Sequence, residues 1–522
     1  MDLTGGARGP PSIPRDPGGH SLKRSVFGLL GGLPPSPRLL DFEDLLNDST
    51  KTDEKRKPSI HFSGIGGTAM VAGARLALEA GWEVRGSDGP LYPPTSEMVK
   101  ALGVKVYEGY RAENLDWNPD LVLIGNALSR GNPEVEIALT RRKHFLSLPE
   151  WMKDHVLRDR RPVVCCGTHG KTTTTALTAF LLDQAGLGGG WLIGGQPLDF
   201  EYSASLGASG APFVIEGDEY DTAFFDKRSK FFHYLPEIAL VTSLEFDHGD
   251  IFGTLEDIRR AFRLMLRQIP ADGWLLGCGD DPEVRDLMAH SFGQTATYGF
   301  ADDATWRGEF TGYDDGFQKV RISRSERVWG KFRLPMAGRH NLQNAIGALA
   351  VAGTLGVPAN DLAQILPRFR GVRRRMEVFM ESQGDLFVSD FAHHPTAIRV
   401  TIQAAKERWP DRRLVAIFEP RSNTTVTNRF QPEITQALAG ADEVIIGPIH
   451  RAERTPEKDR LDRELACCDL AQMGKPGMYS DSVEEIVEHV TRNAHGGNVF
   501  LILSNGAFGG LFARLKEELG EG

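Results

Sequence analysis

The stretch Gly167-Thr-His-Gly-Lys-Thr-Thr173 decides the fold prediction for this chain. It follows an apolar run, Pro162-Val-Val-Cys-Cys166, that predicts a buried strand, and it precedes a helical pattern that ends before Gly186. A glycine-rich turn between a strand and a helix suits phosphate binding, because backbone amides and the positive helix end form an anion cradle. The alternative interpretation is a glycine turn with an incidental lysine.

Two side chains of this loop have the chemistry that a nucleoside triphosphate needs. Lys171 can pair with the β- and γ-phosphates, and the Thr172 hydroxyl can coordinate Mg²⁺. The loop is shorter than the Gly-x-x-x-x-Gly-Lys-Ser/Thr pattern, since only two residues separate its glycines. The order of strand, loop and helix still favours a phosphate loop over an incidental turn.

Strand and helix patterns alternate along the chain in three successive units. The first begins at Ser59-Ile-His-Phe62, the second at Pro162 and the third near Arg373. Such alternation predicts an α/β fold with parallel sheets, Rossmann-like in the first unit. An extension rich in Pro, Gly and charge precedes the units and predicts disorder, with a short helix near 39–46. The expected bounds are 1–57 for the extension and 58–157, 158–371 and 372–522 for the domains.

The composition argues against several classes of protein. The 522 residues carry a formal net charge of -10, which disfavours a generic nucleic-acid or membrane-surface protein. We find no apolar run long enough to span a membrane and no secretory signal, so we expect a cytoplasmic location. The five cysteines have no Cys-x-x-Cys spacing, which argues against structural zinc. The sequence leaves the oligomeric state open.

Four motifs resemble the Mur ligase family, in the order that the family has them. They are His61-Phe-Ser-Gly-Ile-Gly-Gly-Thr-Ala-Met70, the phosphate loop, Gly338-Arg-His-Asn-Leu-Gln-Asn344 and Asp390-Phe-Ala-His-His-Pro395. The resemblance implies a Rossmann-like UDP-binding domain, a central P-loop ATPase-like domain and a C-terminal Rossmann-like ligase domain. It also implies an enzyme that uses ATP and Mg²⁺ to join an amine to a carboxylate on a UDP-sugar through an acyl phosphate, in bacterial cell-wall construction or recycling.

Three further stretches resemble one branch of the family, which ligates the murein tripeptide L-Ala-γ-D-Glu-meso-diaminopimelate to UDP-N-acetylmuramate. They are Tyr92-Pro-Pro94, Gly125-Asn-Ala127 with Arg130-Gly-Asn-Pro133, and the run from Glu219 to Lys230. The branch that adds L-alanine in de novo synthesis is the first alternative. A regulator that binds nucleotide without catalysis is an alternative from another class. The length of peptide that the enzyme accepts is left open.

The resemblance assigns catalytic and metal roles in the central domain. Lys171, Glu219 and His248 are the expected catalytic residues, and Thr172, Glu219 and His248 are the expected Mg²⁺ ligands. The four acids of Glu216-Gly-Asp-Glu-Tyr-Asp221 leave the choice of ligand open, and a solvated acidic loop is the alternative. No lysine occurs between His248 and Lys319, so the carbamylated lysine of several family members is not expected. The expected ATP contacts are Gly167, Thr168, His169, Gly170, Lys171, Thr172, Thr173, His340, Asn344, Arg375 and Asp390.

The first glycine loop is the expected UDP-sugar site. Glycines let the chain turn tightly near a pyrophosphate, and Asp88 follows the second strand, where a dinucleotide enzyme binds ribose. An NAD-dependent oxidoreductase is therefore a rival on this segment alone, although the full Gly-x-Gly-x-x-Gly pattern is absent. The expected UDP-sugar contacts are Gly64, Gly66, Gly67, Thr68 and Asp88.

Basic residues of the third unit are candidates for the peptide, whose carboxylates need cationic partners. These candidates are Arg421, His450, Arg451 and Arg454, and ordinary exposed arginines are the alternative. Arg373 and Arg374 precede Arg375 at the apparent hinge and fit either ATP contacts or a solvated face. Asn341 fits either a nucleotide contact or a helix cap.

Overall fold

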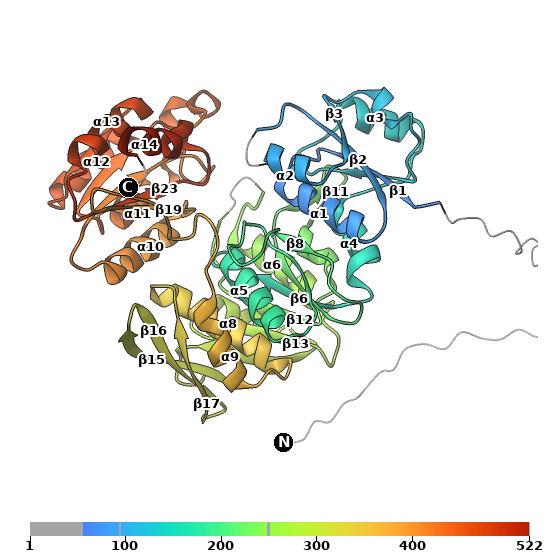
Figure 1. Cartoon of the computed structure of the whole chain (residues 1–522), viewed down its shortest axis with the longest axis horizontal. Helices are drawn as coiled ribbons and strands as arrows, with labels where there is room; N and C mark the ends of the chain where they lie inside the picture. Colours follow the sequence, from blue (N-terminus) through green and yellow to red (C-terminus); the bar gives the residue numbers. More distant parts are fainter. Residues whose placement is uncertain (1–55, 93–94, 248–250, 521–522) are drawn as a thin grey trace, which may run out of the picture. The chain divides into compact units, whose positions relative to one another are not determined.

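The structure is a computed structural model that describes residues 56–92, 95–247 and 251–520 (Figure 1). Nearly all of the extension predicted at 1–57, with its short helix at 39–46, lies outside the described residues. His248, an expected catalytic residue, also lies outside them. Among the described residues, no helix is long and apolar enough to cross a membrane.

The N-terminal domain is a parallel sheet in the order β3-β2-β1-β4-β5. This is the doubly wound order, and it confirms the Rossmann-like prediction. A topological switch point lies between β1 and β4, where ligands of such sheets bind, and the glycine loop directly follows β1. The strands are β1 (Ser59–Ser63), β2 (Glu83–Asp88), β3 (Lys105–Glu108), β4 (Leu121–Ile124) and β5 (Phe145–Leu146). The helices are α1 (Thr68–Glu79), α2 (Thr95–Ala101), α3 (Pro133–Thr140) and α4 (Leu148–Met152).

The middle domain contains a ten-stranded mixed sheet in the order β17-β16-β15-β14-β13-β12-β6-β9-β7-β8. Its central strands are parallel and buried, and α5 packs against both α8 and β9. The strands before the hairpin region are β6 (Arg161–Cys166), β7 (Gly190–Leu192), β8 (Ala204–Ser205), β9 (Pro212–Gly217), β12 (Ile238–Val241), β13 (Trp274–Cys278) and β14 (Gln294–Gly299). The helices are α5 (Lys171–Gln184), α6 (Leu255–Leu266), α7 (Pro282–Met288), α8 (Arg339–Thr354) and α9 (Ala359–Ile365).

Three antiparallel strands extend this sheet: β15 (Trp306–Asp314), β16 (Phe317–Arg324) and β17 (Arg327–Leu334). They lie beside α8 and α9 (Figure 1), and the buried Val320 and Ile322 of β16 alternate with partly exposed neighbours. Both connecting turns have two residues at positive φ, Asp315-Gly316 and Ser325-Glu326. Sequence analysis predicted parallel alternation alone and missed these hairpins, although Asp-Gly is a hairpin signal.

The C-terminal domain is a six-stranded sheet in the order β18-β19-β23-β20-β21-β22, with β18 as an antiparallel edge. Separate apolar cores cover its two faces. The carboxyl ends of its parallel strands meet at one edge, where Asp390, Ser504 and Glu419 follow one another across the sheet. The strands are β18 (Glu377–Ser382), β19 (Asp385–Asp390), β20 (Arg413–Phe418), β21 (Glu443–Ile446), β22 (Gly477–Tyr479) and β23 (Asn498–Leu503). The helices are α10 (Pro395–Arg408), α11 (Gln431–Leu438), α12 (Arg463–Gln472), α13 (Val483–Asn493) and α14 (Leu511–Leu519).

Candidate active site

The predicted phosphate loop joins β6 to α5 and leaves the amino end of α5 open to an anion. Gly170 is the N-cap of α5 in the left-handed region (φ 79°), without a side-chain cap and without an acid in the first helical turn. A Cβ atom at Gly170 would lie 2.5 Å from Asn344 Oδ1, and one at Gly167 would overlap the Thr242 hydroxyl. Both positions therefore require glycine, and the helix N–H groups are available for phosphate oxygens.

Lys171 is held as a cation inside the loop. Its Nζ donates to Glu219 Oε1 at 2.8 Å and to the carbonyl oxygen of Gly167 at 2.8 Å. Burial alone would lower the pKa of Lys171, but the charge and hydrogen bond of Glu219 outweigh burial and raise the pKa above its usual value. The ammonium is therefore present throughout the physiological pH range, beside the open end of α5.

Glu216 contacts the hydroxyl that the sequence assigned to Mg²⁺. Thr172 Oγ1 donates to Glu216 Oε1 at 2.9 Å, and the backbone N–H of Gly194 donates to Glu216 Oε2 at 2.8 Å. Burial raises the pKa of Glu216. Thr172, Glu216 and Glu219 together provide the hydroxyl and carboxylate oxygens that a hard cation prefers, so these residues fit Mg²⁺. Sequence analysis placed Glu216 only within the undecided acidic run.

The other two acids of that run form ion pairs with lysines outside the phosphate loop. Asp218 pairs with Lys230 at 2.5 Å, and burial, which would raise the pKa of Asp218, is outweighed by the Lys230 charge, which lowers it. Asp221 pairs with the exposed Lys227 at 2.5 Å in the hairpin of β10 (Asp221–Ala223) and β11 (Asp226–Ser229). The acidic run is therefore not one solvated loop, because each of its acids has its own partner.

The first turns of α8 bring three residues that were considered for nucleotide binding to a large cavity, which residues of all three α/β units line. His340, Asn341 and Asn344 all line it. Burial lowers the pKa of His340 to about 4, with the charges of Arg375 and His169 acting in the same direction, so this ring is neutral at pH 7. Asn341 Nδ2 donates to the carbonyl oxygen of Ala337 at 2.8 Å, which supports the structural alternative for Asn341.

The hinge into the C-terminal domain runs beside a loop of the middle domain. Arg373 N donates to the carbonyl oxygen of Gln196 at 2.9 Å. The three successive arginines have different environments: Arg374 donates to the carbonyl oxygen of Gly506 at 2.8 Å, whereas Arg375 reaches Thr172 Oγ1 at 3.3 Å. Arg374 is thus neither a solvated charge nor directed at the phosphate loop, and Arg375 is the hinge arginine at the loop.

Asp390 lines the cavity but is already bonded within its own domain. Its carboxylate accepts from the backbone N–H groups of Met376 at 2.8 Å and Ala392 at 2.9 Å, and from Thr401 Oγ1 at 3.3 Å. Burial raises the pKa of Asp390. Through these bonds the Asp390 carboxylate connects Met376 at the hinge to Thr401 of α10. A ribose bound at Asp390 would have to share the carboxylate oxygens with these donors.

The first glycine loop is held by the aspartate that the sequence assigned to ligand. Gly66 N donates to Asp88 Oδ2 at 2.6 Å, and Tyr110 Oη donates to Asp88 Oδ1 at 2.8 Å. Thr68 begins α1, whose first turn carries no acid, and it lines the cavity. Gly64, Gly66, Gly67 and Thr68 thus lie in one turn. Asp88, at the end of β2, holds this turn by accepting a hydrogen bond from Gly66.

Two of the four basic peptide candidates, Arg421 and His450, contact each other through their side chains. Arg421 Nη1 is 3.2 Å from His450 Nδ1 and 3.3 Å from Glu419 Oε1. Arg421 also lines a side cavity of about 220 Å³ together with Tyr220, His393, Ser422, Asn423, Thr424 and Asn505. Arg451 and Arg454 are exposed and line neither this cavity nor the larger one.

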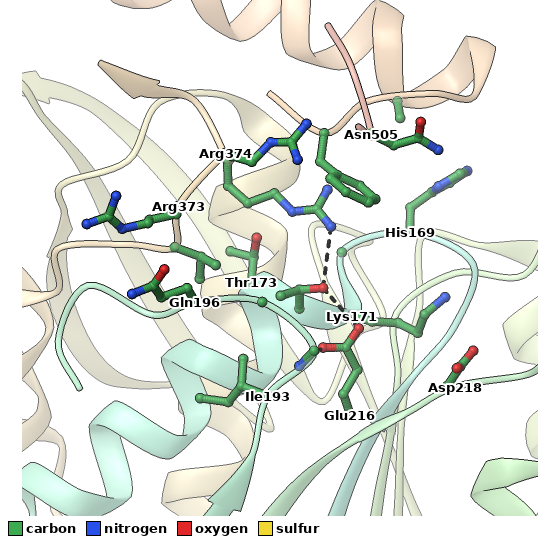
Figure 2. Close-up of a pocket in the computed structure, with 18 of the residues that line it drawn as sticks. His169, Lys171, Thr173, Ile193, Gln196, Glu216, Asp218, Arg373, Arg374 and Asn505 are labelled. Atoms are coloured by element: carbon green, nitrogen blue, oxygen red, sulfur yellow. Dashed lines mark hydrogen bonds between the residues drawn. The ribbon is translucent and has the colours of Figure 1, made fainter. Parts of the chain in front are cut away.

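The larger cavity, of about 1290 Å³, collects residues of all three α/β units. Lys171, Glu216 and Asp218 lie on one side of it, and Arg374 and Asn505 lie on the opposite side (Figure 2). Two lining residues that sequence analysis did not assign, His394 and Thr396, come from the start of α10 and meet Glu245 of the middle domain. The second histidine of Asp390-Phe-Ala-His-His-Pro395 was the available signal for this contact.

Comparison with known families matches each unit in turn. The Mur ligase family catalytic domain matches residues 59–160, the Mur ligase middle domain matches 165–352, and the Mur ligase glutamate ligase domain matches 374–506. These matches cover most of the sequence in the expected order. The chain belongs to the Mur ligase family, and the resemblance and three-domain α/β architecture predicted from the motifs are confirmed.

Within the family, the chain is similar to two kinds of ligase. It is 39% identical over 463 residues to the UDP-N-acetylmuramate–L-alanyl-γ-D-glutamyl-meso-2,6-diaminoheptandioate ligase of Escherichia coli, across 88% of this chain and 98% of that protein. It is 32% identical over 467 residues to the UDP-N-acetylmuramate–L-alanine ligase of Methylobacillus flagellatus, across 88% of this chain and 96% of that protein. The crystal structure of a murein peptide ligase from Psychrobacter arcticus superposes with a TM-score of 0.67 at 34% identity, covering 89% of this chain and 99% of that one.

Proposed function

We propose that this enzyme uses ATP to ligate the murein tripeptide L-Ala-γ-D-Glu-meso-diaminopimelate to UDP-N-acetylmuramate in peptidoglycan recycling. One observation carries the proposal: a single cavity is lined by Thr68 beside the first glycine loop, by the phosphate loop and by the hinge residue Arg375. A ligase must bring a UDP-sugar carboxylate, a nucleotide and an amine into one space. The substrate named for the Escherichia coli relative supports the choice of peptide, and a cytoplasmic location is part of the proposal.

The phosphate loop and the acids beside it would hold ATP with Mg²⁺. Bound ATP supplies the phosphoryl group that turns the weakly electrophilic carboxylate into an acyl phosphate. The N–H groups at the start of α5 and the Lys171 ammonium face phosphate oxygens, and Thr172, Glu216 and Glu219 offer oxygens to Mg²⁺. On nucleotide binding, Lys171 would exchange its contact with Glu219 for a phosphate oxygen, and the pairing with Glu219 already holds Lys171 in its charged form.

The C-terminal side of the cavity would position the peptide and exclude water. Arg421 lines the side cavity and contacts His450, and Asn505 lines both cavities. A cationic side chain there suits the carboxylates of the tripeptide. Arg375 approaches the phosphate loop from the same domain and contacts Thr172. This contact would form when the C-terminal domain covers the reacting centre and excludes water from it.

Two alternatives are weaker on the same observations. Ligation of L-alanine rests on the relative that is 32% identical, compared with 39% for the tripeptide ligase. A nucleotide-binding regulator would not need the Lys171, Glu216 and Glu219 constellation, because binding alone requires no carboxylates beside the cation.

Phosphate release in the presence of ATP, Mg²⁺ and UDP-N-acetylmuramate tests the proposal. We expect the tripeptide to stimulate release and L-alanine to have little effect, with Lys171→Ala removing the stimulation. Stimulation by L-alanine alone would replace the tripeptide assignment with the de novo branch. Absence of stimulation by either amine would favour the regulator, and Lys171→Ala with full turnover would contradict the role of the phosphate loop.

A further inference from the structure

A cluster of two histidines and one glutamate joins the phosphate loop to the C-terminal domain. His169 Nε2 contacts Glu245 Oε1, and His394 Nδ1 lies 3.2 Å from the same oxygen. One atom from each of the three side chains lies within 4.8 Å of the others, and the two imidazole rings have centroids 5.0 Å apart. None of the three was assigned to Mg²⁺ above, so the cluster is distinct from the Thr172, Glu216 and Glu219 oxygens.

Two members of the cluster are fixed by the backbone of the middle domain. Glu245 N donates to Thr168 Oγ1 at 3.0 Å, and Thr168 Oγ1 is 3.2 Å from the carbonyl oxygen of Glu245. His169 N donates to Ser243 Oγ at 3.0 Å. The loop that carries His169 and the strand end that carries Glu245 are therefore held together before any ligand arrives.

The third member comes from the start of α10 and is nine-tenths buried. The side chain of His394 is 7% exposed, and its Nε2 has no hydrogen-bond partner among the described residues. Thr396 N lies 3.4 Å from His394 Nδ1 as a donor, which places a lone pair on Nδ1 and the ring proton on Nε2. The same Nδ1 faces Glu245 Oε1, so a cation bound there would take the Nδ1 lone pair in place of the Thr396 N–H.

We propose that His169, Glu245 and His394 form a binding site for a divalent transition-metal ion of the Zn²⁺ class. A single proton can bridge only two of the facing atoms of His169, Glu245 and His394. One divalent ion, in contrast, accepts an electron pair from each of the three. Two imidazole nitrogens and one carboxylate oxygen are a ligand set that Zn²⁺ uses with an open fourth position. Mg²⁺ prefers oxygen ligands in octahedral geometry, so the set selects against the ion of the phosphate loop.

The surroundings of the carboxylate match those of a metal ligand. Thr396 Oγ1 donates to Glu245 Oε2 at 3.2 Å, which orients the carboxylate and leaves Oε1 toward the rings. Because His394 caps α10 of the C-terminal domain while Glu245 belongs to the middle domain, a bound ion ties the C-terminal domain to the phosphate loop.

Co²⁺ titration of the metal-free, full-length protein tests the site, because Co²⁺ reports its geometry through visible ligand-field bands. In excess Mg²⁺ we expect one Co²⁺ per chain, four- or five-coordinate bands, and displacement by Zn²⁺. His394→Gln should weaken binding at least about 100-fold, and Thr396→Val, which removes only the orienting hydroxyl, about tenfold. His393→Gln is the matched control, because the Nδ1 of this neighbouring ring donates to the carbonyl oxygen of Phe391 at 2.9 Å and lies outside the cluster.

Each alternative outcome has its own signature. Wild-type affinity in His394→Gln overturns the site. Loss of binding in Glu219→Gln with retention in His394→Gln places the ion at the phosphate loop instead and also overturns it. Thermal unfolding of each variant without metal checks that it folds, and Glu245→Gln, which keeps an oxygen for Thr396, provides a second ligand variant. None of these measurements depends on ligase turnover, so their outcome is separate from that of the proposed function.

Discussion

Arg375 Nη2 lies 3.3 Å from Thr172 Oγ1, so a hinge residue at the start of the C-terminal domain reaches the phosphate loop of the middle domain. The two residues are 203 positions apart in the sequence. Thr172 also donates to Glu216, which places the guanidinium, the hydroxyl and the carboxylate in one chain of contacts. This contact places a cation of the C-terminal domain beside the phosphate loop of the middle domain.

Replacing Arg375 with Ala should lower kcat/KM for ATP by about 10²–10³-fold, the usual loss when one preorganised donor is removed from a developing charge. Steady-state kinetics with varied ATP measure the effect. Arg370→Ala is the matched control, because Arg370 is an exposed hinge arginine that lines neither cavity. Equal losses in the two variants would mean that the hinge needs positive charge in general and not a guanidinium at Thr172.

Lys171 and Glu219 form an ion pair with side-chain exposures of 14% and 3%. Lys171→Ala should destabilise the protein by about 3 kcal/mol, because it leaves a buried carboxylate without its ammonium. The double variant Lys171→Ala/Glu219→Gln should recover part of that stability while turnover remains lost. Urea unfolding of the single and double variants gives the coupling energy. An unchanged unfolding midpoint in Lys171→Ala would show that the pair contributes nothing to stability.

Glu134 should position the UDP-sugar loop from beneath. Its buried carboxylate accepts from Ser63 Oγ at 2.5 Å, Ser87 Oγ at 2.6 Å and Asn114 Nδ2 at 2.6 Å, and Ser63 directly precedes the first glycine of the loop. Glu134→Gln replaces one acceptor with a donor, so KM for UDP-N-acetylmuramate should rise about tenfold, the equivalent of one charge-assisted hydrogen bond. KM for ATP should remain unchanged.

Glu136→Gln on the same helix α3 is the control for Glu134, because Glu136 pairs with Arg130 at 40% side-chain exposure. Surface pairs contribute little to stability, so this variant should behave like the wild type. A parallel rise of KM for both substrates in Glu134→Gln would indicate general unfolding of the domain instead of a positioning role.

His340 should make stability depend on pH in the weakly acidic range. The unfolded ring takes up a proton near its usual pKa of 6.5, whereas burial lowers the folded pKa to about 4. Between these values the unfolded chain binds more protons, so stability falls as pH decreases, by about 2 kcal/mol from pH 7 to pH 5. Urea unfolding of the wild type and of His340→Gln at both pH values measures this difference. The same pH dependence in both proteins would assign it to other groups.

The regular elements that sequence analysis found are those with a strong local signal. The strands Leu121–Ile124 and Glu443–Ile446 are buried along their whole length, and such strands of a parallel sheet are recognisable as apolar runs. The hairpins of β15 to β17 were missed because half of their side chains face solvent and their apolar signal alternates. The third α/β unit was predicted, but the order of its strands in the sheet was not, since strand order depends on the crossovers.

The candidate site likewise contains residues that the local sequence predicted and residues that only the fold brings together. The phosphate loop and its lysine were predicted because strand, loop and helix are contiguous, and the structure places Lys171 at the amino end of α5. The partners of that loop were not assigned by sequence analysis, because Glu216, Glu245 and His394 are brought to it by other strands and by another domain. Asp88 lies at the first glycine loop and Asp390 lines the larger cavity, but only the fold reveals that each already accepts hydrogen bonds from backbone N–H groups.

The sequence by itself determined the α/β class, the phosphate loop and the family, because glycine geometry and apolar periodicity act over a few residues. Tertiary structure alone decided which acid meets Thr172, which of the three hinge arginines reaches the phosphate loop, and that His394 faces Glu245. These contacts join residues tens to hundreds of positions apart. Their geometry depends on sheet order and on the packing of whole domains, which no local pattern encodes.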